Sequence, residues 1–175
     1  MRSGTGLKVK SAIKKKAGMQ RAGKEFFTGD VIQVAQKLPG MDIVIKHGST
    51  EVRYSITETE AYNGTEDKAC HASKGRTPRT EVMFQEGGLL YVYFVYGMHW
   101  MMNIVTGPRD VAQAVLIRGA GNISGPGRLT KALGIDGSFN GESVINSPRI
   151  WIEDTGLQLP VAAMPRVGIN YAGEP

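Results

Sequence analysis

The sequence predicts a single α+β domain, built on a mostly antiparallel, curved sheet with flanking helices. Its 175 residues are enough for one domain with a hydrophobic core but too few for two. Short runs of β-branched and aromatic residues recur between turn residues, a pattern typical of antiparallel sheets. The 23 glycines disfavour long helices, so helical spacing is expected only in short segments.

In the first half of the chain, the residues after the N-terminal region predict a helix followed by a β-hairpin. Apolar residues recur at helical spacing over residues 31–38, with Asp30 or Gly29 as the N-terminal cap. The helix-breaking Pro39 ends this segment. The elements expected next are a strand at residues 41–46, a turn at residues 47–49, a strand at residues 51–59 and a loop at residues 63–80.

The second half predicts further strands and one short helix. The most β-prone run covers residues 89–95, turns at Tyr96-Gly97 and returns over residues 99–105. The other expected elements are strands at residues 112–118, 150–152 and 166–169, and a helix at residues 128–133 behind Gly125-Pro126-Gly127.

The positive charge of the chain is concentrated at its N-terminus. Residues 1–24 carry eight Lys or Arg and no acidic residue, and since the whole chain is +5, the remainder is −3. We expect residues 1–24 to form a disordered basic arm, with a short helix at residues 8–16, and residues 25–175 to form the folded domain. The arm either tethers the protein to phosphates, directs transport into a mitochondrion, or is a solvated tail without a role.

Composition argues against several classes of protein. A single cysteine, Cys70, excludes an internal disulfide and a cysteine-rich zinc site, and it suits a reducing compartment. The longest apolar stretch, residues 87–105, is interrupted by Tyr96-Gly97, His99 and Asn103, so we expect no membrane span. His71 follows Cys70, but the pair lacks the further ligands of a metal site. No metal site is expected.

The strand at residues 51–59 leads into two carboxylates. Because side chains alternate along a strand, Val52 and Ile56 share a face. The same parity continues to Glu58, Glu60 and Tyr62. Either the two glutamates simply reach water at a sheet edge, or one is a general base at the floor of a pocket, since a carboxylate facing a core is costly unless it is paired or functional.

Aromatic side chains are placed where a flat ligand could be held. Tyr91 and Tyr93 point to one face of their strand and Phe94 to the other, although a tyrosine-rich core strand explains this equally well. Tyr96 lies beside Gly97 at a turn, and a large aromatic at an exposed turn is a good wedge between stacked bases.

These residues together fit chemistry on a nucleobase. An enzyme that acts on a base in a duplex flips it out, so it needs a wedge, a slot of flat side chains and a group that activates water. Tyr96 would be the wedge, and Glu60 would activate the water. The slot would be lined by Tyr62, His71 and Tyr93.

Several motifs, in this order, resemble the alkyladenine (3-methyladenine) DNA glycosylase family. The resemblance runs from about Phe26 to the last residue. The motifs are Glu58-Thr59-Glu60-Ala61-Tyr62-Asn63-Gly64, Asp67-Lys68-Ala69-Cys70-His71, Arg76-Thr77-Pro78-Arg79-Thr80, Tyr91-Val92-Tyr93-Phe94-Val95-Tyr96-Gly97-Met98, Met102-Asn103-Ile104, Ala114-Val115-Leu116-Ile117-Arg118, Gly125-Pro126-Gly127-Arg128-Leu129, Arg166-Val167-Gly168-Ile169 and Ala172-Gly173-Glu174.

The resemblance implies a monofunctional glycosylase that removes alkylated or deaminated purines from double-stranded DNA in base-excision repair. It implies that Glu60 deprotonates the attacking water, with Arg118 and the backbone carbonyl of Val167 as further partners of that water. The implied base-binding residues are Tyr62, His71, Tyr93 and Asn103, with Asn103 opposing the 2-amino group of guanine. Tyr96, on a protruding β-hairpin that inserts into DNA, would fill the gap left in the duplex. We expect a monomer that uses no cofactor.

Two departures from the family pattern accompany the resemblance. Only residues 119–124 connect the strand at 112–118 to Gly125, where family members carry a helical insertion, and the chain stops at Pro175, before a closing strand, so we expect a C-terminally shortened member. A catalytically impaired protein that binds lesion DNA is one alternative. A carbohydrate hydrolase that uses Glu58 and Glu60 is another. The expected location is the cytoplasm or nucleoid of a bacterium, or the nucleus or mitochondrion of a eukaryote.

Overall fold

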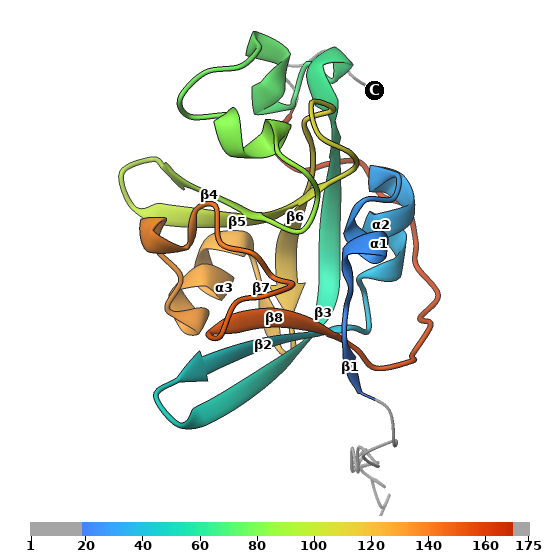
Figure 1. Cartoon of the computed structure of the whole chain (residues 1–175), viewed down its shortest axis with the longest axis vertical. Helices are drawn as coiled ribbons and strands as arrows, with labels where there is room; N and C mark the ends of the chain where they lie inside the picture. Colours follow the sequence, from blue (N-terminus) through green and yellow to red (C-terminus); the bar gives the residue numbers. More distant parts are fainter. Residues whose placement is uncertain (1–18, 170–175) are drawn as a thin grey trace, which may run out of the picture.

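The computed structural model describes residues 19–169 (Figure 1). Most of the expected arm, including its helix at residues 8–16, and the Ala172-Gly173-Glu174 motif therefore lie outside the described residues. The last part of the expected arm contributes β1 (Gln20–Arg21), which pairs with β8 (Ile150–Asp154). Ala22 is buried in the core. Residues 20–22 thus belong to the sheet and its core.

One mostly antiparallel sheet organises the chain, which confirms the α+β prediction. Its eight strands run in the order β1-β8-β2-β3-β6-β5-β4, and β7 pairs with β6 outside this path. The remaining strands are β2 (Asp42–His47), β3 (Thr50–Asn63), β4 (Leu90–Val95), β5 (His99–Thr106), β6 (Gln113–Ala120) and β7 (Ile123–Ser124).

The long strand β3 joins the two halves of the sheet. Its first part, from Thr50 to Ser55, pairs with β2, and its second part, from Ile56 to Asn63, pairs with β6. The register shifts between Ile56 and residue 59, and such a bulge bends a strand and re-aims its side chains. Strict alternation was therefore too simple a prediction for this strand. Pairing with β6 also extends β3 beyond the predicted end at residue 59.

Three helices lie beside the sheet: α1 (Lys24–Phe27), α2 (Val31–Lys37) and α3 (Pro126–Leu133). Asp30 caps α2, because its carboxylate accepts hydrogen bonds from the N–H groups of Ile32 and Gln33, at 3.0 and 3.1 Å. The hydroxyl of Thr59 donates to the carbonyl of Ala35 at 2.8 Å and ties β3 to α2. None of the helices within residues 19–169 is long enough to span a bilayer.

Short 3-10 helices lie within and just after the loop expected at residues 63–80. They are η1 (Gly64–Glu66), η2 (His71–Lys74) and η3 (Glu81–Phe84), and a fourth, η4 (Gly137–Phe139), follows α3. In Figure 1 the segment that contains η1–η3, drawn in green, lies around the upper end of β3. A small hydrophobic cluster, separate from the main core, joins η2 and η3 to the sheet and contains Cys70, Ala72, Met83, Phe84, Tyr91, Val105, Ala112 and Ala114.

After β8, residues 155–169 form a C-terminal strap without a helix or strand. The strap runs along α2 and β3, at the right of Figure 1. It is tied at its start, where the hydroxyl of Thr155 donates to the carbonyl of Gly40 at 2.7 Å. The strand predicted at residues 166–169 is wrong. The N–H of Val167 bonds to a side chain instead of a neighbouring strand, and Gly168 has a φ of +76°, which breaks an extended backbone.

Candidate active site

Glu60 is a buried carboxylate held by three elements of the fold. Its side chain is 6% exposed. The hydroxyl of Tyr62 donates to Oε2 at 3.0 Å, the N–H of Val167 donates to Oε1 at 2.7 Å, and Nη1 of Arg118 lies 3.4 Å from Oε1. These partners make burial of the carboxylate tolerable. The interpretation that Glu60 simply reaches water at a sheet edge is therefore wrong.

Glu58 lies in a different environment from Glu60. It is exposed and sits in the bulge of β3, between the two register shifts. A carbohydrate hydrolase needs a second carboxyl group whose surroundings keep it protonated until it donates. Glu58 is instead open to solvent, unlike the buried Glu60, so this geometry does not favour the scheme with two carboxylates.

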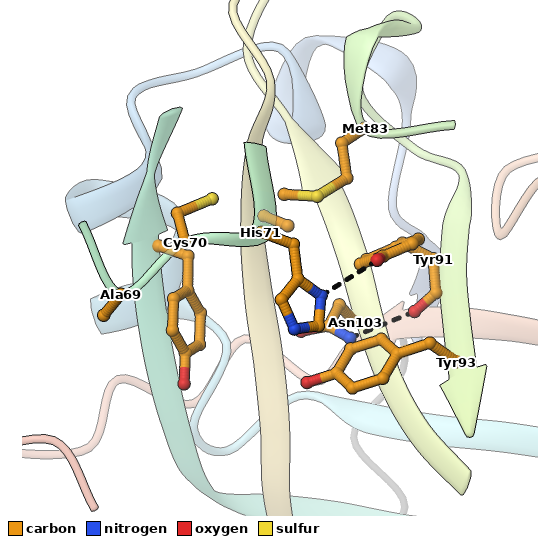
Figure 2. A pocket seen from close by; sticks show the side chains of 9 residues that line it. Ala69, Cys70, His71, Met83, Tyr91, Tyr93 and Asn103 are labelled. Atoms are coloured by element: carbon orange, nitrogen blue, oxygen red, sulfur yellow. Dashed lines mark hydrogen bonds between the residues drawn. The ribbon is translucent and has the colours of Figure 1, made fainter. Parts of the chain in front are cut away.

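A small pocket opens between β3, β4 and the loop that begins η2 (Figure 2). Its lining contains all of the base-binding residues expected from the sequence. The residues that line it are Tyr62, Ala69, Cys70, His71, Met83, Tyr91, Tyr93, Asn103 and Ala114. Figure 2 shows the imidazole of His71 directed toward the rings of Tyr91 and Tyr93.

His71 is fixed in this pocket and uncharged at neutral pH. Its Nδ1 lies 3.0 Å from the hydroxyl of Tyr91, and its ring centroid lies 4.5 Å from that of Tyr93. Burial, reinforced by the positive charges of Arg79 and Lys74, lowers the pKa of His71 to about 4. The pocket thus presents a neutral imidazole.

The other polar groups of the pocket are also held in place. The rings of Tyr91 and Tyr93 lie 5.1 Å apart, and the guanidinium of Arg79 covers the Tyr93 ring at 5.3 Å. Asn103 is 3% exposed, and its Nδ2 donates to the carbonyl of Tyr91 at 3.0 Å. The pocket is therefore a slot of oriented aromatic faces with one buried amide.

Tyr62 connects this pocket to a second, larger space. A cleft of about 1010 Å³ lies between α2, the second half of β3 and the strap, and its lining includes Glu60, Arg118 and Val167. The ring of Tyr62 lines the small pocket, whereas its hydroxyl bonds to Glu60 at the cleft. Burial and the neighbouring Glu60 charge raise the pKa of Tyr62, so the phenol stays protonated as a donor.

Tyr96 lies outside the pocket, at the tip of the hairpin between β4 and β5. It is 87% exposed and has a φ of +52°, a left-handed conformation that is unusual for a non-glycine residue. The hairpin beneath it is anchored to α3, because the hydroxyl of Thr130 donates to the carbonyl of Trp100 at 2.8 Å. The ring of Trp100 packs on Phe94, with centroids 4.7 Å apart. These contacts therefore fix the hairpin that carries the exposed ring of Tyr96.

The described residues contain no group of three or more His, Cys, Asp or Glu that could hold a metal ion. Cys70 is 2% exposed, and burial raises the pKa of its thiol to about 11. The thiol therefore stays protonated at neutral pH and packs as a small apolar group.

Two features of the site were not predicted from the sequence. Tyr91 lines the pocket, and its position two residues before Tyr93 on the same strand face would have indicated this. Arg166 forms an ion pair with Asp67, with 2.5 Å between Nη1 and Oδ2. These two residues are 99 positions apart, and no local pattern links them.

Comparison with known protein families finds a match along most of this chain. The family model of methylpurine-DNA glycosylase matches residues 25–124 and 120–175. The two matches overlap at residues 120–124, from the end of β6 through β7, where the resemblance implies an insertion.

Three bacterial relatives carry the name "Putative 3-methyladenine DNA glycosylase". The protein of Psychrobacter cryohalolentis is 43% identical and is aligned over 70% of each chain. That of Desulfitobacterium hafniense is 40% identical over 89% of this chain and 91% of its own. That of Rickettsia felis is 42% identical over 84% of this chain and 85% of its own. The chain belongs to the methylpurine-DNA glycosylase family.

Proposed function

We propose that this protein flips alkylated or deaminated purines out of double-stranded DNA and hydrolyses their N-glycosidic bond with water activated by Glu60. Its family gives it the role of a DNA glycosylase in base-excision repair. One structural observation supports the proposal that Glu60 acts on a base held in the pocket. A buried, fixed carboxylate lies beside an aromatic pocket, and Tyr62 belongs to both.

The small pocket would hold the extruded base between aromatic faces. Tyr62, His71 and Tyr93 would stack on it, and each such contact is worth roughly 1–3 kcal/mol, comparable to the cost of flipping. Because His71 is neutral, it does not repel a purine that carries the positive charge of alkylation, and the electron-rich tyrosine rings attract one. Asn103, fixed by its bond to Tyr91, would exclude normal guanine by opposing its 2-amino group.

Glu60 would serve the bond-breaking step. Cleavage of an N-glycosidic bond passes through a cationic, oxocarbenium-like sugar, which a carboxylate stabilises while it also takes a proton from the attacking water. Arg118 and the carbonyl of Val167 would hold that water, since both residues already adjoin the carboxylate. The scheme uses no metal, cofactor or lysine nucleophile, so the product is an abasic site in an uncut strand.

Tyr96 would occupy the gap that the flipped nucleotide leaves. Its exposed ring at the hairpin tip has the size and placement of a wedge between base pairs. We propose that a monomer performs the whole reaction, since every residue named above comes from one chain. It would act wherever the cell keeps its DNA, in the nucleoid of a bacterium or in the nucleus or mitochondrion of a eukaryote.

Single-turnover excision tests the proposal. A duplex with one hypoxanthine or ethenoadenine is incubated with excess protein and then treated with alkali, which cuts at abasic sites. The wild-type protein is expected to produce cleavage, Glu60→Gln to abolish it, and Glu58→Gln, a matched carboxylate change two residues away, to retain it. Folded wild-type protein that binds the duplex but excises neither these bases nor 7-methylguanine would overturn the proposal in favour of a catalytically impaired lesion binder.

A further inference from the structure

Arg166 and Asp67 form a buried ion pair beside the site. Nη1 of Arg166 lies 2.5 Å from Oδ2 of Asp67, and Nη2 lies 3.1 Å from Oδ1, so the pair is bidentate. The two side chains are 17% and 6% exposed. Breaking such a pair leaves a buried charge without its partner, so we expect the pair to stay formed.

Asp67 is built into the loop that follows β3. Its carboxylate also accepts the N–H groups of Asn63, at 3.0 Å, and Ala69, at 2.9 Å. Burial alone would raise the pKa of Asp67, but the Arg166 guanidinium and these two N–H groups lower it below its ordinary value. Asp67 is therefore a fixed negative charge at the end of the strand that carries Glu60.

Arg166 connects the C-terminal strap to that strand. Besides the ion pair, its Nη1 donates to the carbonyl of Ala61 at 3.1 Å, and its guanidinium lies 5.1 Å from the centre of the Tyr62 ring. The next residue, Val167, donates its N–H to Glu60 at 2.7 Å. Because the strap has no strand partner at this point, these contacts of Arg166 fix where the Val167 backbone lies.

We infer that Asp67 and Arg166 are positioning residues, which hold the backbone of Val167 against Glu60 and steady the ring of Tyr62. The kinetic consequence rests on the proposed role of Glu60, whereas the placement of the Val167 amide does not. Small displacements of a catalytic group cost much rate, because the reacting atoms must meet at a defined distance and angle. The ion pair therefore acts on catalysis through the carboxylate and not by touching DNA.

Hydrogen exchange of the Val167 amide, followed by NMR, tests the placement without any substrate. We expect a protected amide in the wild-type protein and faster exchange in both Arg166→Gln and Asp67→Asn. Arg166→Gln removes the ion pair from the side of the strap and keeps the hydrogen bonds of Asp67 to the loop. It therefore still tests the inference if Asp67→Asn fails to fold. Arg53→Gln removes a comparable bidentate pair with Glu153, on the far part of β3, and should leave the Val167 amide unchanged. Exchange at the wild-type rate in Arg166→Gln would overturn the inference.

A kinetic measurement separates positioning from binding. In single-turnover excision, Arg166→Gln is expected to be slower by roughly 100-fold while the Kd for lesion DNA stays within about threefold of the wild-type value. Arg166→Lys, which keeps the charge but not the bidentate geometry, should recover part of the rate. A weaker Kd with an unchanged rate would overturn the positioning role. A wild-type protein without activity would instead refute the proposed function, and the amide exchange would still decide the placement.

Discussion

The hydroxyl of Tyr62 lies 3.0 Å from the carboxylate of Glu60 and donates a hydrogen bond to it, so the wall of the aromatic pocket and the proposed general base form one unit. A base stacked on the Tyr62 ring would be held by the same residue that orients the carboxylate. Tyr62 therefore couples recognition of the base, through its ring, to catalysis, through its hydroxyl. Removing the hydroxyl oxygen alone separates these two contributions in an experiment.

Tyr62→Phe keeps the ring and removes that hydrogen bond. A hydrogen bond to a charged group is worth about 1.5–3 kcal/mol, so we expect excision to slow by roughly 10- to 100-fold with little loss of affinity for lesion DNA. The measurement is single-turnover excision beside a Kd for the same duplex, with Tyr54→Phe on the first half of β3 as the control. An unchanged rate in Tyr62→Phe would refute the coupling.

Tyr96 combines an exposed side chain with a strained backbone, as a residue kept for function and not for stability would. A left-handed conformation costs a non-glycine residue roughly 1–2 kcal/mol, which glycine does not incur. Tyr96→Gly should therefore raise the free energy of unfolding by about 1 kcal/mol in urea denaturation. The same variant should lose excision on duplex DNA and retain more of it on a single strand, where no stacked neighbours must be parted. Equal losses on both substrates would argue against a wedge.

The lowered pKa of His71 makes the stability of the protein depend on pH. Between the ordinary value near 6.5 and the value of about 4 in the folded protein, the unfolded chain binds a proton that the folded chain does not. Stability is therefore lost as the pH falls through this window, by at most about 1.4 kcal/mol per pH unit. Urea denaturation of the wild-type protein and His71→Gln at about pH 7 and about pH 5 should show a smaller loss in the variant. Identical losses would contradict the buried, neutral state of His71.

Gly87 lies where the backbone segments of α1 and the loop before β4 meet. A Cβ atom at this position would stand 2.2 Å from the carbonyl oxygen of Phe27, which as backbone cannot move aside. Gly87→Ala should lower the free energy of unfolding by about 3 kcal/mol. Gly29→Ala is the matched control, because its Cβ would make only ordinary contacts, at 3.5 and 3.6 Å. Similar stability of the two variants would show that the close approach is relieved elsewhere.

Local patterns predicted most of the strands and three residues of the pocket, Tyr62, His71 and Tyr93. Asn103 was implied by the family resemblance alone. Local patterns failed where distant segments decide the structure. The bulge in β3 depends on its partner β6, and it separates the environments of Glu58 and Glu60. Residues 166–169 were predicted as a strand, but the N–H of Val167 bonds to the side chain of Glu60. The Arg166–Asp67 pair could be found only once the fold brought the two together.

The basic N-terminal region offers a last test, and the fold determines where it must be cut. Ala22 is buried and β1 pairs with β8, so a deletion through residue 24 would damage the sheet as well as remove charge. Removing residues 1–18 takes away six Lys or Arg and leaves the described fold intact. If these side chains bind phosphates, the slope of log K against log salt concentration should flatten by about 0.9 for each phosphate that is no longer neutralised. Binding of undamaged duplex, measured from low to moderate salt, checks this. An unchanged slope would show that the non-specific affinity for DNA comes from the folded domain and not from residues 1–18. The lysines and arginines of that domain would then have to form a basic surface despite its acidic residues.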